Sequence, residues 1–339
     1  MSVRDLAYTS VAGRLVLAPI ARWGYRRSVA QGATPHLGYR AMRKLYGCAS
    51  PAPWEQLVER AAGAQPRLDI PADAPGLASG QVADVVDGLR AHGYHVLPDL
   101  LDAAVCDELE AVARAATCTM IGGPGDGGRA RFDEAAPQAV RYDVAEADAV
   151  ASPAAQRLIA DLSLLSVAQA YLGATPVQDL VAMWWSAAIG EDASSAAAQL
   201  FHFDLDRLRF LKVFVFLTDV DEHNGPHVYV EGSHRDRPPE MRRDGRHADA
   251  EVEAAYPGRS RALTGPRGTV FLADTIGMHK GQGLERGHRL VFQVEYATSL
   301  FGAPFTRVGV TDPTPELAAA AARYPWTFQR FHPVGDAEQ

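Results

Sequence analysis

Residues 201–235 read FHFDLDRLRFLKVFVFLTDVDEHNGPHVYVEGSHR and include the most apolar strand candidate of the chain, FLKVFVFL at 210–217. A turn signal, NGP at 224–226, separates this segment from another candidate at 226–231. Three more strand candidates lie at 179–188, 268–273 and 289–297. The chain before them is patterned mainly as helices, for example over 153–172. Helices followed by short strands predict an α+β domain with an antiparallel, jelly-roll or cupin-like core.

The charge of the chain is unevenly distributed. The 339 residues carry a net charge of −8, which argues against a general nucleic-acid binder. Residues 1–50 hold eight basic residues and one acidic residue, so this stretch carries +7 and the remainder carries −15. We expect residues 1–78 to form a helical N-terminal cap that docks on the acidic remainder.

The cysteines and the hydropathy of the chain indicate the cellular compartment in which we expect it. Cys48, Cys106 and Cys118 are an odd number without CxxC spacing, which argues against a disulfide framework or a thiolate zinc site and suits a reducing compartment. No stretch has the length and apolar character of a transmembrane segment. We therefore expect a cytoplasmic protein.

The triplet His202-Phe203-Asp204 is the sharpest candidate for chemistry. Two other H-x-D triplets occur, at 234–236 and 247–249, so the triplet alone is not diagnostic. Those two lie inside a polar segment, 234–267, that we expect to be a solvated loop or lid between strands. Only 202–204 directly precedes an apolar strand. In an extended segment its first and third side chains point to one face, where both can bind one metal ion.

A metal site at this position needs a further ligand. His279 follows the strand candidate 268–273 and is the best supplier, although His234 and His288 compete with it. His288 is adjacent to Arg289, so their side chains face opposite ways on a strand. Two histidines and one carboxylate are the ligand set of non-haem Fe(II) oxygenases. A hairpin after His279 would return Arg289 to the same pocket, where its planar guanidinium suits a carboxylate.

Three segments of the chain resemble parts of one protein family. The stretch 201–235 resembles the core of the phytanoyl-CoA dioxygenase family of Fe(II)/2-oxoglutarate oxygenases. The segment GPRGTVFLADTIGMHKGQGLERGHRLVFQVEY (265–296) resembles its second block, and AHGYHVLPDLLDAAVCDELEAV (91–112) is similar to its opening strand and helix. The resemblance implies a double-stranded β-helix over about 79–305. The small hydroxyl residue that the family often has two places after the distal histidine is absent, since Gly281 stands there.

The resemblance also implies the cofactors and the roles of individual residues. It gives His202, Asp204 and His279 as ligands of Fe(II), Arg289 as the anchor of the cosubstrate 2-oxoglutarate, and O2 as the oxidant. Halogenating relatives lack the carboxylate ligand, so Asp204 indicates hydroxylation or a related oxidation instead. The expected reaction oxidises a small organic substrate and converts 2-oxoglutarate to succinate and CO2. The expected substrate is a small molecule, either free or linked to a carrier or CoA.

Other functions remain open at this level. One alternative is a cupin-like binding or sensor protein without catalysis, and another is a metal-dependent isomerase or hydrolase on the same scaffold. Met183, Trp185 and Lys212 are candidates for the pocket lining. We expect residues 306–339 to form a helical C-terminal tail. We expect no nucleic-acid partner, and a homodimer is one possible arrangement of the chain.

Overall fold

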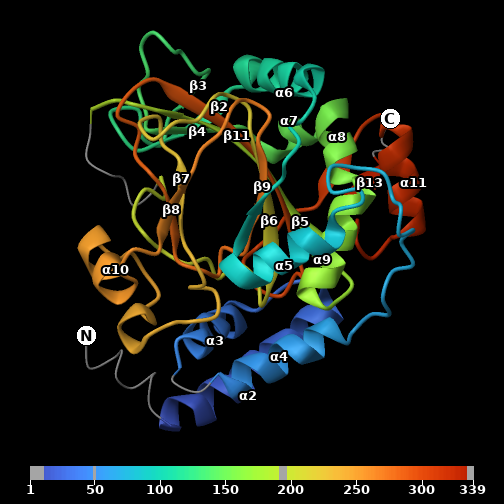
Figure 1. Cartoon of the computed structure of the whole chain (residues 1–339). Coiled ribbons are helices and arrows are strands. Elements are labelled where there is room, and N and C mark those ends of the chain that lie inside the picture. Colours follow the sequence, from blue (N-terminus) through green and yellow to red (C-terminus); the bar gives the residue numbers. More distant parts are fainter. Residues whose placement is uncertain (1–10, 49–50, 191–196, 334–339) are drawn as a thin grey trace.

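Two antiparallel sheets face each other in the computed structural model, which describes residues 11–48, 51–190 and 197–333. In order across the larger sheet, the strands are β1 (Tyr94–Val96), β9 (Val270–Ala273), β6 (Phe210–Phe216), β11 (His288–Ala297), β5 (Val177–Ala187), β4 (Arg141–Asp143), β2 (Cys118–Ile121) and β3 (Arg129–Ala130). The smaller sheet has the order β10 (His279–Gly281), β7 (His227–Val230) and β8 (Ser260–Leu263). This arrangement confirms the α+β, double-stranded β-helix prediction (Figure 1).

Strand β6 shows why the apolar sequence at 210–217 determines the layering. All of its residues are buried, because both of its faces are covered. Leu211, Val213 and Val215 contribute to the core beneath the helices, whereas Phe214 and Phe216 contribute to the core between the two sheets. The alternation of a strand thus assigns successive side chains to two different cores.

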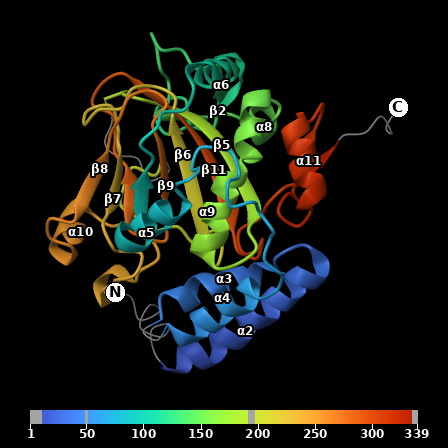
Figure 2. The same cartoon turned by 45° about the vertical axis from the view of Figure 1, so that its right-hand side comes forward.

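Helices cover the outer face of the larger sheet (Figure 2). They are α5 (Val82–His92), α6 (Ala103–Ala115), α7 (Glu146–Val150), α8 (Pro153–Ile159), α9 (Leu162–Leu172) and α11 (Pro315–Arg323). The single helix predicted over 153–172 is in fact α8 and α9. The break occurs because the Asp161 carboxylate accepts hydrogen bonds from the backbone N–H groups of Ser163 and Leu164, which begins a new helix. Strands β12 (Val308–Val310) and β13 (Phe331–Pro333) pair in parallel near α11.

The N-terminal region forms a helical layer at one end of the sandwich (Figure 2). It comprises α2 (Val11–Gln31), α3 (His36–Tyr46) and α4 (Ala52–Ala62). Helices α2 and α3 cross closely at Gly24 and Gly38. This approach requires glycine, because a Cβ at Gly24 would lie only 2.5 Å from the Cα of Gly38. Side chains such as Met42 and Leu57 share one hydrophobic cluster with Phe203 and Phe301 of the sandwich. The layer therefore packs directly beneath the H-x-D segment.

The polar segment 234–267 is folded against the body and is not the solvated loop that its composition predicted. It contains a 3₁₀ turn (Pro239–Met241), α10 (Asp249–Ala255) and strand β8. Met241, Val252 and Tyr256 are buried in the cluster shared with the N-terminal helices. Arg43 also reaches across to Asp244 at 2.7 Å. Within the described ranges, no helix has the length and apolarity needed to cross a bilayer.

Truncating a buried side chain of α3 should destabilise the whole protein. Met42 is 0% exposed and Leu37 on the same helix is 57% exposed. Met42→Ala should lower the free energy of unfolding by about 2–5 kcal/mol through lost burial and a residual cavity. Leu37→Ala should leave it within about 0.5 kcal/mol. Urea denaturation measures both values, and an unchanged main transition in Met42→Ala would show that the N-terminal layer unfolds independently.

Candidate metal centre

Three side chains that can bind a metal ion converge inside the sandwich. They are His202 and Asp204, which precede β6, and His279, which begins β10. One ligand atom from each of the three lies within 4.8 Å of the other two. The structure thus brings together the three side chains singled out in the sequence, and His202 and His279 are both buried.

Backbone hydrogen bonds fix the two segments that carry these residues. His202 and His279 face each other in an isolated antiparallel bridge, with N–H to O=C distances of 2.9 and 2.8 Å. The backbone N–H of Asp204 also donates to Thr275 O at 2.8 Å. Phe203 points the other way, into the hydrophobic cluster that it shares with the N-terminal helices. The extended segment therefore presents its two polar side chains to the pocket and buries the apolar one.

The imidazole rings are oriented by their own backbone. Nδ1 of His202 donates to Leu200 O and Nδ1 of His279 donates to Gly277 O, both at 2.9 Å. Because a carbonyl can only accept, each Nδ1 carries the proton and each Nε2 keeps its lone pair. The two Nε2 atoms lie 3.5 Å from the carboxylate oxygens of Asp204. Such second-sphere bonds commonly orient metal-binding histidines.

The ionisation states of the three groups suit cation binding. Burial, and then the neighbouring His279, lower the pKa of His202 to about 3. Burial likewise lowers the pKa of His279. Burial alone would raise the pKa of Asp204, but Lys212 and the two histidines lower it below its usual range. At neutral pH the centre therefore offers two neutral imidazoles and one carboxylate. None of the three groups has to release a proton before it can bind a metal ion.

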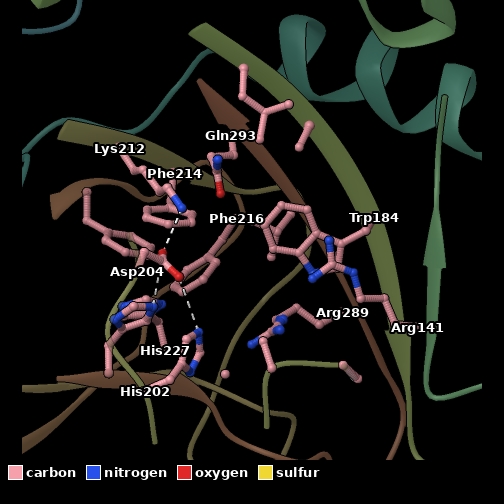
Figure 3. A pocket seen from close by; sticks show the side chains of 18 residues that line it. Arg141, Trp184, His202, Asp204, Lys212, Phe214, Phe216, His227, Arg289 and Gln293 are labelled. Carbon is pink, nitrogen blue, oxygen red and sulfur yellow. Dashed lines mark hydrogen bonds and ion pairs between the residues drawn. The ribbon is translucent and has the colours of Figure 1, made fainter. Parts of the chain in front are cut away.

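Lys212 lies on the pocket wall beside Asp204, as the sequence suggested. Figure 3 shows Lys212 next to Asp204, and its Nζ is 2.7 Å from Asp204 Oδ2. The same Nζ is 3.4 Å from Asp206 Oδ2 and 3.5 Å from Glu295 Oε2. Burial opposes the charge of Lys212, but these carboxylates, Asp204 first, raise its pKa. Asp204 is the main counter-charge of this ammonium ion, because burial raises the pKa of Asp206 and, more strongly, that of Glu295. The ammonium ion in turn fixes the orientation of the Asp204 carboxylate.

Arg289 lies in the same pocket without a comparable partner. Its side chain is 6% exposed, its Nη2 is 3.4 Å from Ser186 Oγ, and its Nε is buried without a hydrogen-bond acceptor. Burial, and then the nearby Arg141, lower the pKa of Arg289 to about 10, so it stays protonated at neutral pH. Within the described ranges no acidic side chain forms an ion pair with it. A buried cation without a counter-charge is costly, so this end of the pocket fits an anion.

The path by which Arg289 reaches the pocket differs from the expected hairpin. Strand β10 pairs with β7 in the smaller sheet, whereas β11 pairs with β5 and β6 in the larger one. The chain between His279 and Arg289 therefore crosses from one sheet to the other. As a result the two side chains face each other across a cavity of about 200 Å³. His288 lies on the opposite face of β11, near Phe132 and Trp185.

The assignment of Met183 and Trp185 to the pocket lining is wrong. Both side chains belong to the core beneath the helices, and the Trp185 indole N–H donates to Ala113 O. The residue between them, Trp184, lines the cavity instead. The reason is the register of β5, in which Ser186 and Trp184 pair with Arg289 and Val291. Side chains at paired positions share one face of a sheet.

The structure adds pocket residues that the sequence did not identify. These are Arg141, Trp184, His227 and Gln293. The guanidinium of Arg141 stacks on Trp184, with its Cζ 4.5 Å from the ring centroid, and its Nε donates to Asp143. The one sequence signal for Trp184 is the alternation of side chains along β5, which places Trp184 and Ser186 on one face of the strand and Met183 and Trp185 on the other. Arg141, His227 and Gln293 depend on strand pairings that the sequence does not encode locally.

The donor set and the anion pocket together fit a metal ion with an anionic ligand. Two neutral imidazole nitrogens and one carboxylate oxygen are the 2-His-1-carboxylate set that non-haem Fe(II) enzymes use. The uncompensated guanidinium of Arg289 stands at the other side of the cavity. This separation between a cation-binding and an anion-binding end suits a small ligand that bridges them.

The family model described as phytanoyl-CoA dioxygenase (PhyH) matches residues 89–283, which is more than half of the chain. A comparison with curated proteins gives no match.

Several solved structures are similar in fold. EctD from S. alaskensis with bound Fe is 25% identical, with a TM-score of 0.48, covering 69% of this chain and 83% of that one. HygX from Streptomyces hygroscopicus, with nickel and 2-oxoglutarate bound, is 16% identical, with a TM-score of 0.47, covering 67% and 89%. The epimerase SnoN from nogalamycin biosynthesis is 20% identical, with a TM-score of 0.44, covering 64% and 82%.

Asp274 fastens the turn that leads to His279. Its carboxylate accepts hydrogen bonds from Tyr171 Oη at 2.6 Å and from the backbone N–H of Ile276 at 3.1 Å. Its backbone carbonyl accepts from Tyr229 Oη at 2.7 Å. Burial raises the pKa of Asp274 from 3.8 to about 6, although the hydrogen bonds oppose this change. The position of His279 thus depends on a carboxylate that is costly to ionise.

The Asp274→Asn variant should reveal this cost as a pH dependence. Because the folded pKa lies above the unfolded value, ionisation penalises the folded state fully above pH 6 and not at all below pH 3.8. The stability of the wild type relative to Asp274→Asn should therefore rise as the pH falls from about 7 to about 4. Urea midpoints measured for both proteins across this range give the difference. A difference that stays constant with pH contradicts the buried, ionisable Asp274.

Proposed function

The chain belongs to the phytanoyl-CoA dioxygenase family, and from this premise we propose that it is an Fe(II)- and 2-oxoglutarate-dependent oxygenase that hydroxylates a small organic substrate. The single observation that carries the proposal is the pairing of the His202–Asp204–His279 cluster with the uncompensated Arg289 across one cavity. One end suits a divalent cation and the other suits a carboxylate.

The three clustered side chains would hold the iron. Nε2 of His202, a carboxylate oxygen of Asp204 and Nε2 of His279 would be its protein ligands, the set with which non-haem Fe(II) enzymes also bind a cosubstrate and O2. When bound, iron, 2-oxoglutarate and O2 supply the oxidising power for C–H hydroxylation, with release of succinate and CO2. Asp204 supports hydroxylation over halogenation, because a carboxylate there leaves no ligand position for a halide.

Arg289 would bind the distal carboxylate of 2-oxoglutarate. A guanidinium can donate two parallel hydrogen bonds to a carboxylate, and the anion would supply the missing counter-charge. Lys212 is a less suitable anchor because Asp204, Asp206 and Glu295 already surround it. The cosubstrate would therefore lie between the metal ligands and strand β11, held at its distal end.

Apolar side chains would keep water away from the reacting atoms. Phe214, Phe216, Phe271 and Val291 line the cavity next to the metal ligands. Such walls exclude solvent and protect a reactive oxidant from side reactions. The remaining specificity depends on substrate contacts, and the proposed substrate is a small molecule, free or linked to a carrier or CoA.

Reconstitution with Fe(II) tests the proposed activity. Adding 2-oxoglutarate without O2 should give a visible metal-to-ligand charge-transfer band, and admitting O2 should release succinate slowly even without substrate. His202→Ala should abolish both signals because it removes a ligand. His288→Ala should retain them, because that ring lies on the opposite face of β11. Absence of the band and of succinate in the wild type contradicts the proposal, and turnover without O2 would indicate an isomerase or hydrolase.

Replacing the proposed anchor tests the cosubstrate orientation. Arg289→Gln should weaken the binding of 2-oxoglutarate by about 30-fold or more, because it removes a buried charge from a charge-assisted pair. Titration of the charge-transfer band under anaerobic conditions measures the dissociation constant. Equal affinity in wild type and Arg289→Gln, together with a large loss in Lys212→Met, would assign the anchor to Lys212 instead.

A further inference from the structure

His227 is a pocket histidine that neither the metal cluster nor the anion anchor uses. It begins strand β7, is 8% exposed and lines the cavity. Its Nε2 is enclosed without a hydrogen-bond partner, and no hydrogen bond to its ring occurs within the described part of the chain. A buried polar group without a partner is costly, so this ring is a candidate to contact a ligand.

Aromatic neighbours hold the ring of His227 in place. It stacks on His279 with 5.3 Å between centroids and 12° between planes. Phe214 and Phe271 pack against it at 5.2 and 5.4 Å. Among the described residues, His202, Asp204 and His279 form the metal cluster, and His227 is not part of it. The ring is therefore a rigid neighbour of the metal centre and is oriented without polar contacts of its own.

The strand pairing places His227 beside the anion end of the pocket. Gly281 of β10 is the direct cross-strand partner of His227, so both residues present the same face to the cavity. A Cβ at Gly281 would lie 3.6 Å from Nη2 of Arg289, which locates the guanidinium above this glycine. The charge of Arg289 is also among the causes, after burial and His279, that keep the pKa of His227 low.

Gly281 leaves a space between the imidazole and the guanidinium. It has no side chain to donate to an anion there, and the nearest atoms to an added Cβ are 3.6 and 3.8 Å away. A carboxylate has two oxygens with about four acceptor sites, more than one guanidinium satisfies. In either protonation state an imidazole carries at least one N–H. His227 is thus the neighbouring donor that can complete the binding of an anion held by Arg289.

We propose that His227 donates a hydrogen bond to the distal carboxylate of 2-oxoglutarate, over Gly281 and together with Arg289. This inference rests on the proposed function and names an additional residue that positions the cosubstrate. The imidazole supplies a donor at a place where its partner on β10, Gly281, has no side chain. Because the same ring stacks on His279, it also sets the separation between the metal ligand and the carboxylate site.

The test compares two 2-oxo acids on the Fe(II) protein without O2. 2-Oxopentanoate is 2-oxoglutarate with a methyl group in place of the distal carboxylate. His227→Leu should weaken 2-oxoglutarate about 10-fold, the loss expected for one hydrogen bond to a charged group, while the affinity for 2-oxopentanoate stays within about twofold. Titration of the charge-transfer band gives each dissociation constant. His227→Gln, which keeps an N–H donor, should recover part of the loss.

A second-site variant makes the test sharper. Position 281 does not have the positive φ that would require glycine, and it has room for a Cβ. Adding Gly281→Ser to His227→Leu should therefore restore the affinity for 2-oxoglutarate, because the hydroxyl supplies the missing donor. Adding Gly281→Ala in the same background should not restore it. Thermal melting of each metal-free variant verifies that the fold is retained.

Two outcomes would overturn the inference. An equal loss for both 2-oxo acids in His227→Leu would mean that the ring acts only through packing on His279. An unchanged affinity for 2-oxoglutarate would mean that His227 does not touch the cosubstrate. Both outcomes leave the proposed function intact, since the wild type still gives the band. If the wild type gives no band with 2-oxoglutarate, the proposed function itself fails, and this inference fails with it.

Discussion

The backbone bridge between His202 and His279 is the interaction on which the rest of the site depends. Two short hydrogen bonds join the segment before β6 to the start of β10, which belongs to the opposite sheet. This connection holds both Nε2 atoms next to Asp204 before any metal arrives. Hydrogen bonds from each Nδ1 to the local backbone then fix the rings. A metal ion would therefore find its ligands already oriented, with little conformational entropy to lose.

Charge divides the cavity into two ends. Lys212 lies among three carboxylates near the metal cluster, so its charge is compensated within the protein. Arg289 lies in an equally buried position without such compensation. The difference explains why a dicarboxylate would enter in one direction, with its distal end at β11. The N-terminal helices and the segment 234–267 pack beneath this region, so their burial supports the same bridge from outside.

Local pattern in the sequence predicted much of the fold and the metal cluster. The strands β5, β6, β9 and β11 follow from apolar runs. The convergence of His202, Asp204 and His279 follows from the H-x-D triplet together with the family resemblance. The predictions failed where contacts between segments distant in the sequence determine which side chains are buried or line the pocket. The prediction put Met183 and Trp185 in the pocket, whereas the residue between them lines it. The register of β5 with β11 determines which side chains of β5 face the cavity. The pocket role of His227 depends on pairing with Gly281, and the buried segment 234–267 depends on a cluster completed by distant helices.

A crystal structure grown without O2 in the presence of Mn(II) and 2-oxoglutarate tests the central claim most directly. Anomalous scattering locates the metal, and the density of the cosubstrate gives its direction. The account predicts one Mn(II) ion bound by His202, Asp204 and His279, with the distal carboxylate on Arg289. An ion bound elsewhere, or a cosubstrate whose distal carboxylate faces Lys212, would contradict it.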